Sequence, residues 1–123
     1  MSEKPFIEVP QGPAPTELLI IDEVVGDGPE ATGGASVLVD YVGVGFDSGK
    51  EFDASYNRGE PLSFRVGIGQ VIQGWDRGLL GMQVGGRRKL TIPAHLGYGQ
   101  RGAGGVIKPG ETLIFVVDLV DVR

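Results

Sequence analysis

The sequence predicts an α+β fold in which an antiparallel β-sheet accompanies one short α-helix. Helical periodicity is confined to residues 70–80, where apolar side chains recur at three- and four-residue intervals. The other apolar segments are short or alternate with period two, and turn residues bound them, which is typical of strands. The 123 residues, 41% of them apolar, are enough for one domain with one core.

The chain begins with a proline-rich segment, residues 1–16, that shows no sustained period. It predicts an extended N-terminal arm that lays Phe6 and Ile7 against the domain. Strands are then predicted at 17–25, 36–44, 51–54, 62–66, 88–92 and 113–122. The last of these is expected at the centre of the sheet, because it is apolar on both faces near its start.

The predicted helix contains two glycines, Gly74 and Gly78, each of which costs up to about 1 kcal/mol relative to alanine. Packing against the sheet must therefore hold it in place. Its apolar stripe includes Trp75, the only tryptophan of the chain. The indole is expected to be either structural core or the floor of a pocket.

Two other segments are singled out by their pattern. In residues 51–54, period-two alternation places Phe52 and Ala54 on one side and Asp53 on the other, unless a bulge re-aims Asp53. About twenty residues with six glycines separate the last two predicted strands. A loop of that length inside a small domain is usually functional.

Composition disfavours several classes of function. A net charge of −5 argues against binding to nucleic acid, which needs clustered Lys and Arg. One histidine and no cysteine leave little with which to bind a metal ion, and no cofactor is expected. No apolar run is long enough to span a bilayer, and the N-terminus lacks the apolar core of a signal peptide. We therefore expect a soluble cytoplasmic protein that does not bind membranes.

Five segments, in order and with nearly the family's spacing, resemble the successive signatures of the FKBP family of peptidyl-prolyl cis-trans isomerases. They are Val39-Asp40-Tyr41-Val42-Gly43, Phe52-Asp53-Ala54-Ser55, Val71-Ile72-Gln73-Gly74-Trp75-Asp76, Ala94-His95-Leu96-Gly97-Tyr98-Gly99 and Leu113-Ile114-Phe115. The resemblance runs from about residue 17 to the C-terminus, so residues 17–123 are expected to form an FKBP-type isomerase domain behind the arm.

The resemblance implies a five- to six-stranded antiparallel sheet wrapped around the short helix, with an apolar pocket between them. It also implies proline-containing peptides and unfolded proteins as substrates, macrolides such as tacrolimus and rapamycin as ligands, and a monomer. Carried over by motif, the pocket comprises Tyr41, Phe52, Asp53, Phe64, Val71, Ile72, Trp75, Tyr98, Val106, Ile107 and Phe115. The sequence departs from the family at Leu62, where many members have an aromatic, and in the glycine-rich loop at 101–105.

The chemistry that such a pocket supports follows from the amide itself. Rotation about an X–Pro bond meets a barrier of about 18–20 kcal/mol, set by resonance, and breaks no bond. An apolar pocket raises the free energy of the polar planar amide relative to that of the twisted transition state. The Ile72 N–H and the Tyr98 hydroxyl are the candidate donors to flanking carbonyls. Asp53 is expected either to accept hydrogen bonds from Tyr41 or Arg58, or to polarise the twisted amide.

Each of these residues also has a purely structural interpretation. Core packing explains Phe64, Phe115 and Trp75 taken singly, and a lone Asp53 is more often a turn or cap residue. Three functional hypotheses therefore stay open: a prolyl isomerase, a binding module for proline-containing partners or macrolides, and a non-catalytic interaction domain whose aromatics are all core. Tyr98, between two glycines in its loop, favours the first two over the third.

Overall fold

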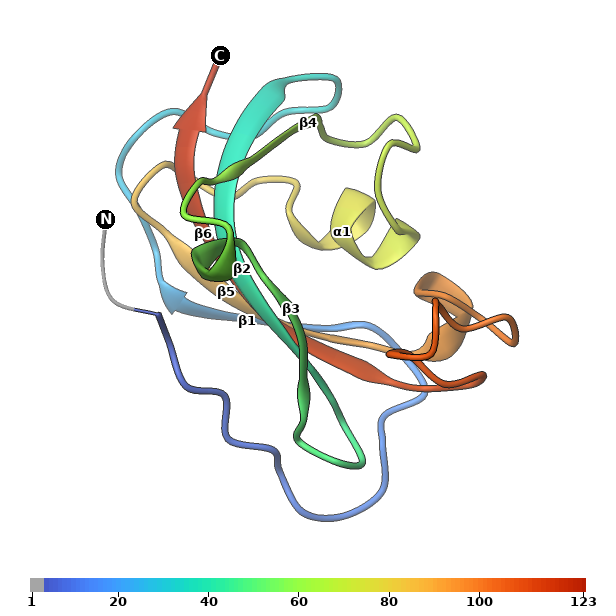
Figure 1. Ribbon diagram of the computed structural model, residues 1–123. Coiled ribbons are helices and arrows are strands. Elements are labelled where there is room, and N and C mark those ends of the chain that lie inside the picture. The colour runs from blue at the N-terminus through green and yellow to red at the C-terminus, as the bar shows by residue number, and fades with distance from the viewer. Residues whose placement is uncertain (1–3) are drawn as a thin grey trace.

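The computed structural model describes residues 4–123 and confirms the predicted fold class. Six antiparallel strands form one sheet, in the order β1-β5-β6-β2-β3 with β4 also paired to β2. The sheet curves around the one α-helix found within residues 4–123 (Figure 1). The elements are β1 (Leu19–Val24), β2 (Ser36–Gly45), β3 (Glu51–Ala54), the 3₁₀ turn η1 (Ser55–Asn57), β4 (Leu62–Arg65), α1 (Gln73–Gly78), β5 (Arg87–Ile92), η2 (Ala94–Leu96) and β6 (Leu113–Val122).

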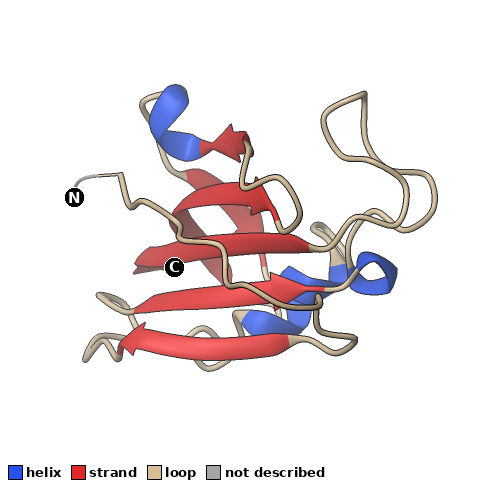
Figure 2. Ribbon diagram, turned by 90° about the horizontal axis from the view of Figure 1, so that it is seen from below, coloured by secondary structure: helices blue, strands red, loops and turns tan. Residues whose placement is uncertain are grey.

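The two ten-residue strands β2 and β6 form the middle of the sheet. As predicted, β6 is central, and its first seven residues are buried on both faces. Both β3 and β4 pair with β2: residues 36–39 pair with β4, and residues 42–44 pair with β3. At the opposite side, β1 is an edge strand whose six residues are all exposed, seen at the bottom of Figure 2.

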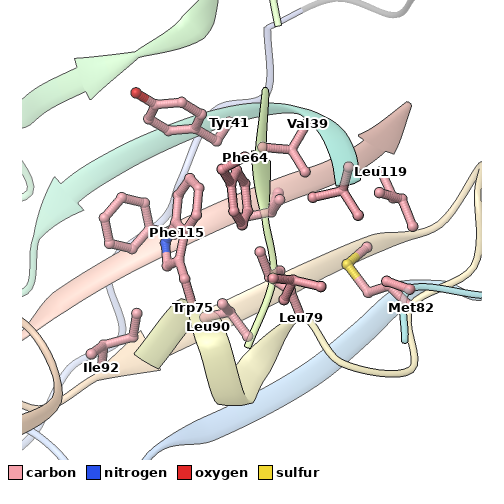
Figure 3. Close-up of a cluster of buried hydrophobic side chains, with 14 of the residues drawn as sticks. Val39, Tyr41, Phe64, Trp75, Leu79, Met82, Leu90, Ile92, Phe115 and Leu119 are labelled. Atoms are coloured by element: carbon pink, nitrogen blue, oxygen red, sulfur yellow. The ribbon is translucent and has the colours of Figure 1, made fainter. Parts of the chain in front are cut away.

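Each face of the sheet has its own apolar cluster. The larger one lies between the sheet and α1 and contains Trp75 and Leu79 from the helix or its end, as Figure 3 shows. The smaller one lies on the other face, where the N-terminal arm crosses. Ile7 is buried there, but Phe6 is 89% exposed, so the expectation that both pack against the domain is correct only for Ile7.

The helix is shorter than predicted, six residues instead of eleven. Residues 67–69 form a turn in which Gly67 and Gly69 have positive φ angles, and the Asp76 carboxylate accepts hydrogen bonds of 2.8 Å from both of their N–H groups. Residue Ile72, with φ −59° and ψ 152°, is still extended. The apolar spacing of the helix thus continues into the preceding loop, although the backbone of that loop is not helical.

The glycines of α1 explain how so short a helix is held. A Cβ on Gly74 would lie 2.5 Å from Cγ2 of Ile92, and one on Gly78 would lie 2.9 Å from Cδ1 of Leu90. These glycines therefore bring the helix backbone directly against two buried side chains of β5. At the other end of the helix, the Arg88 guanidinium donates to the carbonyl oxygens of Gly78, the last helical residue, and Leu80.

A β-bulge overturns the simple alternation expected for β3. Gly43 pairs with Asp53 and Val44 pairs with Glu51, so Phe52 is the extra residue without a partner on β2. Phe52 consequently packs against the helix-side cluster, whereas Ala54 is buried in the cluster on the other face. The bulge places Asp53 next to Phe52 at the same cavity, instead of on the opposite side of the sheet.

Candidate active site

A cavity of about 180 Å³ opens beside the N-terminal end of α1, between the helix, β3 and the glycine-rich loop. It is smaller than the roughly 300–1,000 Å³ of a site for a drug-sized ligand, and its size suits a single small ring. Its lining is mainly aromatic and aliphatic: Tyr41, Phe52, Asp53, Leu62, Gln70, Val71, Ile72, Trp75, Tyr98 and Phe115.

The inner wall of the cavity is a cluster of edge-to-face aromatic rings around Trp75. The ring centroids of Tyr41 and Phe115 lie 5.0 Å and 5.2 Å from that of the indole, each at an interplanar angle of 82°. The ring centroids of Phe52 and Phe115 lie 5.4 Å apart, and the two ring planes make an angle of 90°. Such contacts are worth about 0.5–1.5 kcal/mol each beyond area burial, so they fix the orientation of the rings. The indole Nε1 is buried without a hydrogen-bond partner within residues 4–123, so ring packing alone holds Trp75.

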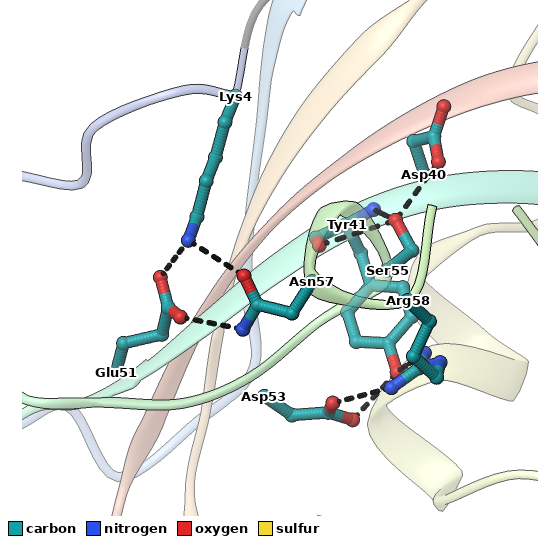
Figure 4. A network of polar contacts seen from close by, with 8 residues as sticks. All are labelled: Lys4, Asp40, Tyr41, Glu51, Asp53, Ser55, Asn57 and Arg58. Atoms are coloured by element: carbon teal, nitrogen blue, oxygen red, sulfur yellow. Dashed lines mark hydrogen bonds and ion pairs between the residues drawn. The ribbon is translucent and has the colours of Figure 1, made fainter. Parts of the chain in front are cut away.

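Two residues of the cavity lining, Tyr41 and Asp53, form a polar triangle with Arg58 (Figure 4). The Tyr41 hydroxyl donates to Oδ2 of Asp53 at 2.5 Å, and Arg58 donates to Oδ1 of Asp53 at 2.7 Å. Arg58 also donates to the Tyr41 hydroxyl oxygen at 2.6 Å. Asp53 thus accepts from both of the partners that the sequence offered as alternatives.

The triangle fixes the protonation of its members at neutral pH. Burial raises the pKa of Asp53, but the hydrogen bonds from Tyr41 and Arg58 outweigh it and leave the pKa below its usual value. Burial, followed by the hydrogen bond to Asp53, raises the pKa of Tyr41 to about 12. Asp53 is therefore an anion, and Tyr41 is a neutral donor.

The turn after β3 positions this triangle. Ser55, at the start of η1, is fully buried, and its Oγ accepts a hydrogen bond of 2.9 Å from the Tyr41 backbone N–H. The same hydroxyl donates to Oδ1 of Asp40 at 2.8 Å. Arg58 follows η1 directly and closes it with hydrogen bonds to the turn carbonyls. The local fold thus brings Arg58 back over Asp53 and the Tyr41 ring, with its guanidinium carbon 5.6 Å from the ring centroid.

The Ile72 backbone N–H and the Tyr98 hydroxyl, which both belong to residues of the cavity lining, have no protein acceptor among the described residues. The Ile72 backbone N–H precedes the helix, and its own carbonyl accepts from the N–H groups of Trp75 and Asp76. The Tyr98 side chain is 39% exposed, and burial, followed by the charge of Asp53, raises the pKa of its hydroxyl. Both donors are therefore available to a bound ligand.

Three of the eleven predicted pocket residues do not line this cavity. Phe64 is buried behind Trp75, at 5.6 Å between ring centroids, and Ile107 is buried in the same cluster. Val106 is 61% exposed and lines a neighbouring groove. In the structure Phe64 and Ile107 thus have core positions, and contact of these three residues with a substrate stays a prediction.

The cavity also includes Gln70, which sequence reasoning placed only as the first residue of the expected helix. Its Oε1 accepts a hydrogen bond of 2.8 Å from the Arg65 N–H, which ties the loop before α1 to β4. Its position directly before Val71 was the only signal, and a polar residue there does not distinguish a pocket wall from an exposed turn.

Across residues 4–123, no cluster of three or more His, Cys, Asp or Glu side chains is placed to hold a metal ion, and none of the helices there has the length and apolar character to cross a membrane.

Comparison with known proteins identifies the family. Residues 28–120 match the family model for FKBP-type peptidyl-prolyl cis-trans isomerases. The chain is 63% identical to an FK506-binding protein of Streptomyces anulatus, over 98% of each chain. It is 52% identical to peptidyl-prolyl cis-trans isomerase FPR2 of Saccharomyces cerevisiae, over 76% of this chain and 70% of the relative.

Solved structures give the same result. The crystal structure of AtFKBP13 from Arabidopsis thaliana superimposes with a TM-score of 0.81 and 44% identity, over 89% of this chain and 96% of that chain. The family match covers the elements that surround the cavity described above: β3, the N-terminal end of α1 and the glycine-rich loop all lie within it. The chain therefore belongs to the family of FKBP-type peptidyl-prolyl cis-trans isomerases.

Proposed function

We propose that the chain accelerates the rotation of X–Pro bonds in peptides and unfolded proteins by binding the prolyl ring in the aromatic cavity, without a covalent intermediate. The observation that carries this proposal is an aromatic wall combined, at one small cavity, with two donors that no described residue engages. The planar amide is stabilised in water by hydration of its charge-separated resonance form. Transfer to an apolar wall removes that hydration and lowers the energy needed to twist the bond.

The two donors have a separate role in this proposal. The Ile72 N–H and the Tyr98 hydroxyl bind peptide carbonyls beside the proline and hold the flanking chain while the amide rotates. Holding the flanking chain in one arrangement reduces the entropy lost on reaching the transition state. Neither role transfers a proton, so no general acid or base is required.

Asp53 acts in this proposal as an anion at the cavity wall. Its hydrogen bonds fix the Tyr41 hydroxyl and the Arg58 guanidinium, so the wall has one arrangement before the substrate arrives. The charge of the carboxylate also lies beside the amide as it twists and loses resonance. Preorganised charge of this kind needs no reorganisation during the reaction.

Replacement of Ile72 tests the role of its N–H directly. Its φ of −59° lies within the range of proline, so Ile72→Pro removes the donor at a φ angle that the proline ring accepts. Ile72→Ala loses the same side chain but keeps the N–H, and it is the matched control. In a prolyl isomerisation assay on short peptides we expect kcat/KM of the proline variant to lie about tenfold below that of the alanine variant, the effect of one lost hydrogen bond. Equal values in two folded variants would refute the role of this donor.

We also propose that macrolides bind at the same site, with one ring in the cavity and the rest of the molecule outside it, because relatives of this chain include proteins named for FK506 binding. Rapamycin would then inhibit the isomerase competitively and change the fluorescence of Trp75. A protein that binds rapamycin at this cavity but does not accelerate isomerisation would instead be a binding module. The absence of cysteine supports a reducing, cytoplasmic setting, and the protein is proposed to act as a monomer.

A further inference from the structure

A second groove, of about 250 Å³, adjoins the candidate active site. It lies between the loop that joins β2 to β3 and the glycine-rich loop before β6. Phe52 lines both the cavity and the groove, so a peptide that leaves the cavity past this ring enters the groove. The lining residues are Ser48, Lys50, Glu51, Phe52, Gly105, Val106, Lys108 and Glu111.

Both carboxylates of the groove are already engaged. Glu51 forms an ion pair of 2.8 Å with Lys4 and accepts a hydrogen bond of 3.0 Å from Asn57, as Figure 4 shows. Glu111 accepts a hydrogen bond of 2.8 Å from the backbone N–H of Lys108. Its other carboxylate oxygen lies so close to Gly45 that a Cβ there would overlap it. Neither acid is therefore turned toward an incoming ligand.

The two lysines of the groove, by contrast, have ammonium groups that no carboxylate of the described residues engages. Lys50 and Lys108 are exposed, and neither forms an ion pair within residues 4–123. Two lysines and two glutamates line the groove, but Lys4 pairs with Glu51 from outside it, so the charges of Lys50, Lys108 and Glu111 that remain sum to +1 on a chain whose net charge is −5. An ammonium group has three donors and no acceptor, so its complement is a carboxylate.

We propose that this groove binds the carboxylate of an Asp or Glu side chain within two residues of the proline that is isomerised. This inference rests on the proposed function, since it assigns a preference to the same site. An extended peptide advances about 3.3–3.6 Å per residue, so two residues suffice to pass the Phe52 ring and reach the groove. Phe52 and the exposed Val106 offer apolar contact to the methylene groups of the acidic side chain, and Lys50 and Lys108 receive its charge.

The test compares peptides that differ only in one charge. Glu and Gln are placed in turn at each of the two positions before and the two positions after the proline, and the catalysed kcat/KM is measured at low ionic strength. Exposed ion pairs are weak, so we expect a Glu-to-Gln ratio of about two to five at one position. The ratio falls toward one at about 0.5 M salt, because the screening length then drops below about 5 Å.

The variant Lys50→Gln with Lys108→Gln should abolish the ratio while leaving kcat/KM for the Gln peptides unchanged. Lys89→Gln, which removes one lysine charge from β5 outside the groove, is the control and should leave the ratio intact. A ratio of one at every position, or a ratio that survives the double substitution, would overturn the inference. If no peptide is accelerated at all, the proposed function itself fails. If the Gln peptides are accelerated but the Glu-to-Gln ratio is one, only the inference about the groove fails.

Discussion

Replacing Gly74 with alanine tests whether the close approach of helix and sheet determines stability and activity together. The added Cβ would lie 2.5 Å from Cγ2 and 2.6 Å from Cδ1 of Ile92, a side chain with no exposed surface into which it can move. Overpacking of a core typically costs about 1–3 kcal/mol. Cγ1 of Ile92, at 2.8 Å, is a third overlapping atom, so the cost falls in the upper part of that range, about 2–3 kcal/mol. Alanine regains up to about 1 kcal/mol of helix propensity, so a net loss of about 1–2 kcal/mol remains.

Thermal and urea unfolding measure this loss. A change of about 1–2 kcal/mol lowers Tm by roughly 4 to 8 °C for a domain of this size. The control is Gly33→Ala: a Cβ added at Gly33 would meet no atom within 4 Å and the residue has no positive φ, so its Tm should stay unchanged. Because Trp75 and Ile72 belong to the same short helix and its N-cap, kcat/KM of Gly74→Ala should fall as well. A Gly74→Ala protein with a Tm at or above that of the wild type would refute this explanation of how α1 is held.

Three further predictions concern the site and the arm. Tyr98→Phe should lower kcat/KM about tenfold with little change in the free energy of unfolding, because the hydroxyl has no protein partner among the described residues; an equal rate would remove Tyr98 from the site. Deletion of residues 1–14 should cost about 1.5–3 kcal/mol of stability through loss of buried Ile7 and leave activity intact, whereas a folded but inactive product would show that the arm completes the site. The free energy of unfolding should fall as pH rises from about 10 to 12, because the pKa of Tyr41 is raised to about 12 in the folded state and the unfolded tyrosine ionises first; Tyr41→Phe should reduce this slope, and an unchanged slope would contradict the assignment.

The periodicity of apolar residues along the chain was sufficient to predict the strands and the existence of the helix. Period-two alternation identified β4 around Phe64, and apolarity on both faces identified β6 as the central strand. The apolar stripe identified the helix and its tryptophan. The start of the helix was predicted too early because it is set by hydrogen bonds from Gly67 and Gly69 to the Asp76 carboxylate, contacts between residues nine and seven positions apart that no period records.

The candidate site was predictable where motif residues project from regular elements, and less so elsewhere. The position of Asp53 beside Phe52 depends on a bulge in the pairing of β3 with β2, and pairing between strands is not encoded in the period of either strand. The glycine-rich loop turns back on itself through a bridge between Ala103 and Ile107, which buries Ile107 and leaves Val106 exposed. Two adjacent aliphatic residues in a loop carry no sequence signal for which of them faces inward.

The specific activity of Trp75→Leu tests the assignment of the cavity as the active site most directly. Trp75 is 4% exposed and also lines the cavity, so leucine should both destabilise the protein by a few kcal/mol and leave part of the cavity wall empty. Unfolding followed by circular dichroism gives the folded fraction, and a prolyl isomerisation assay then gives kcat/KM per folded molecule. We predict that this value falls well below that of the wild type, together with the affinity for rapamycin. A destabilised protein whose activity per folded molecule is undiminished would show that the indole is core only, and would contradict the assignment of this cavity as the active site.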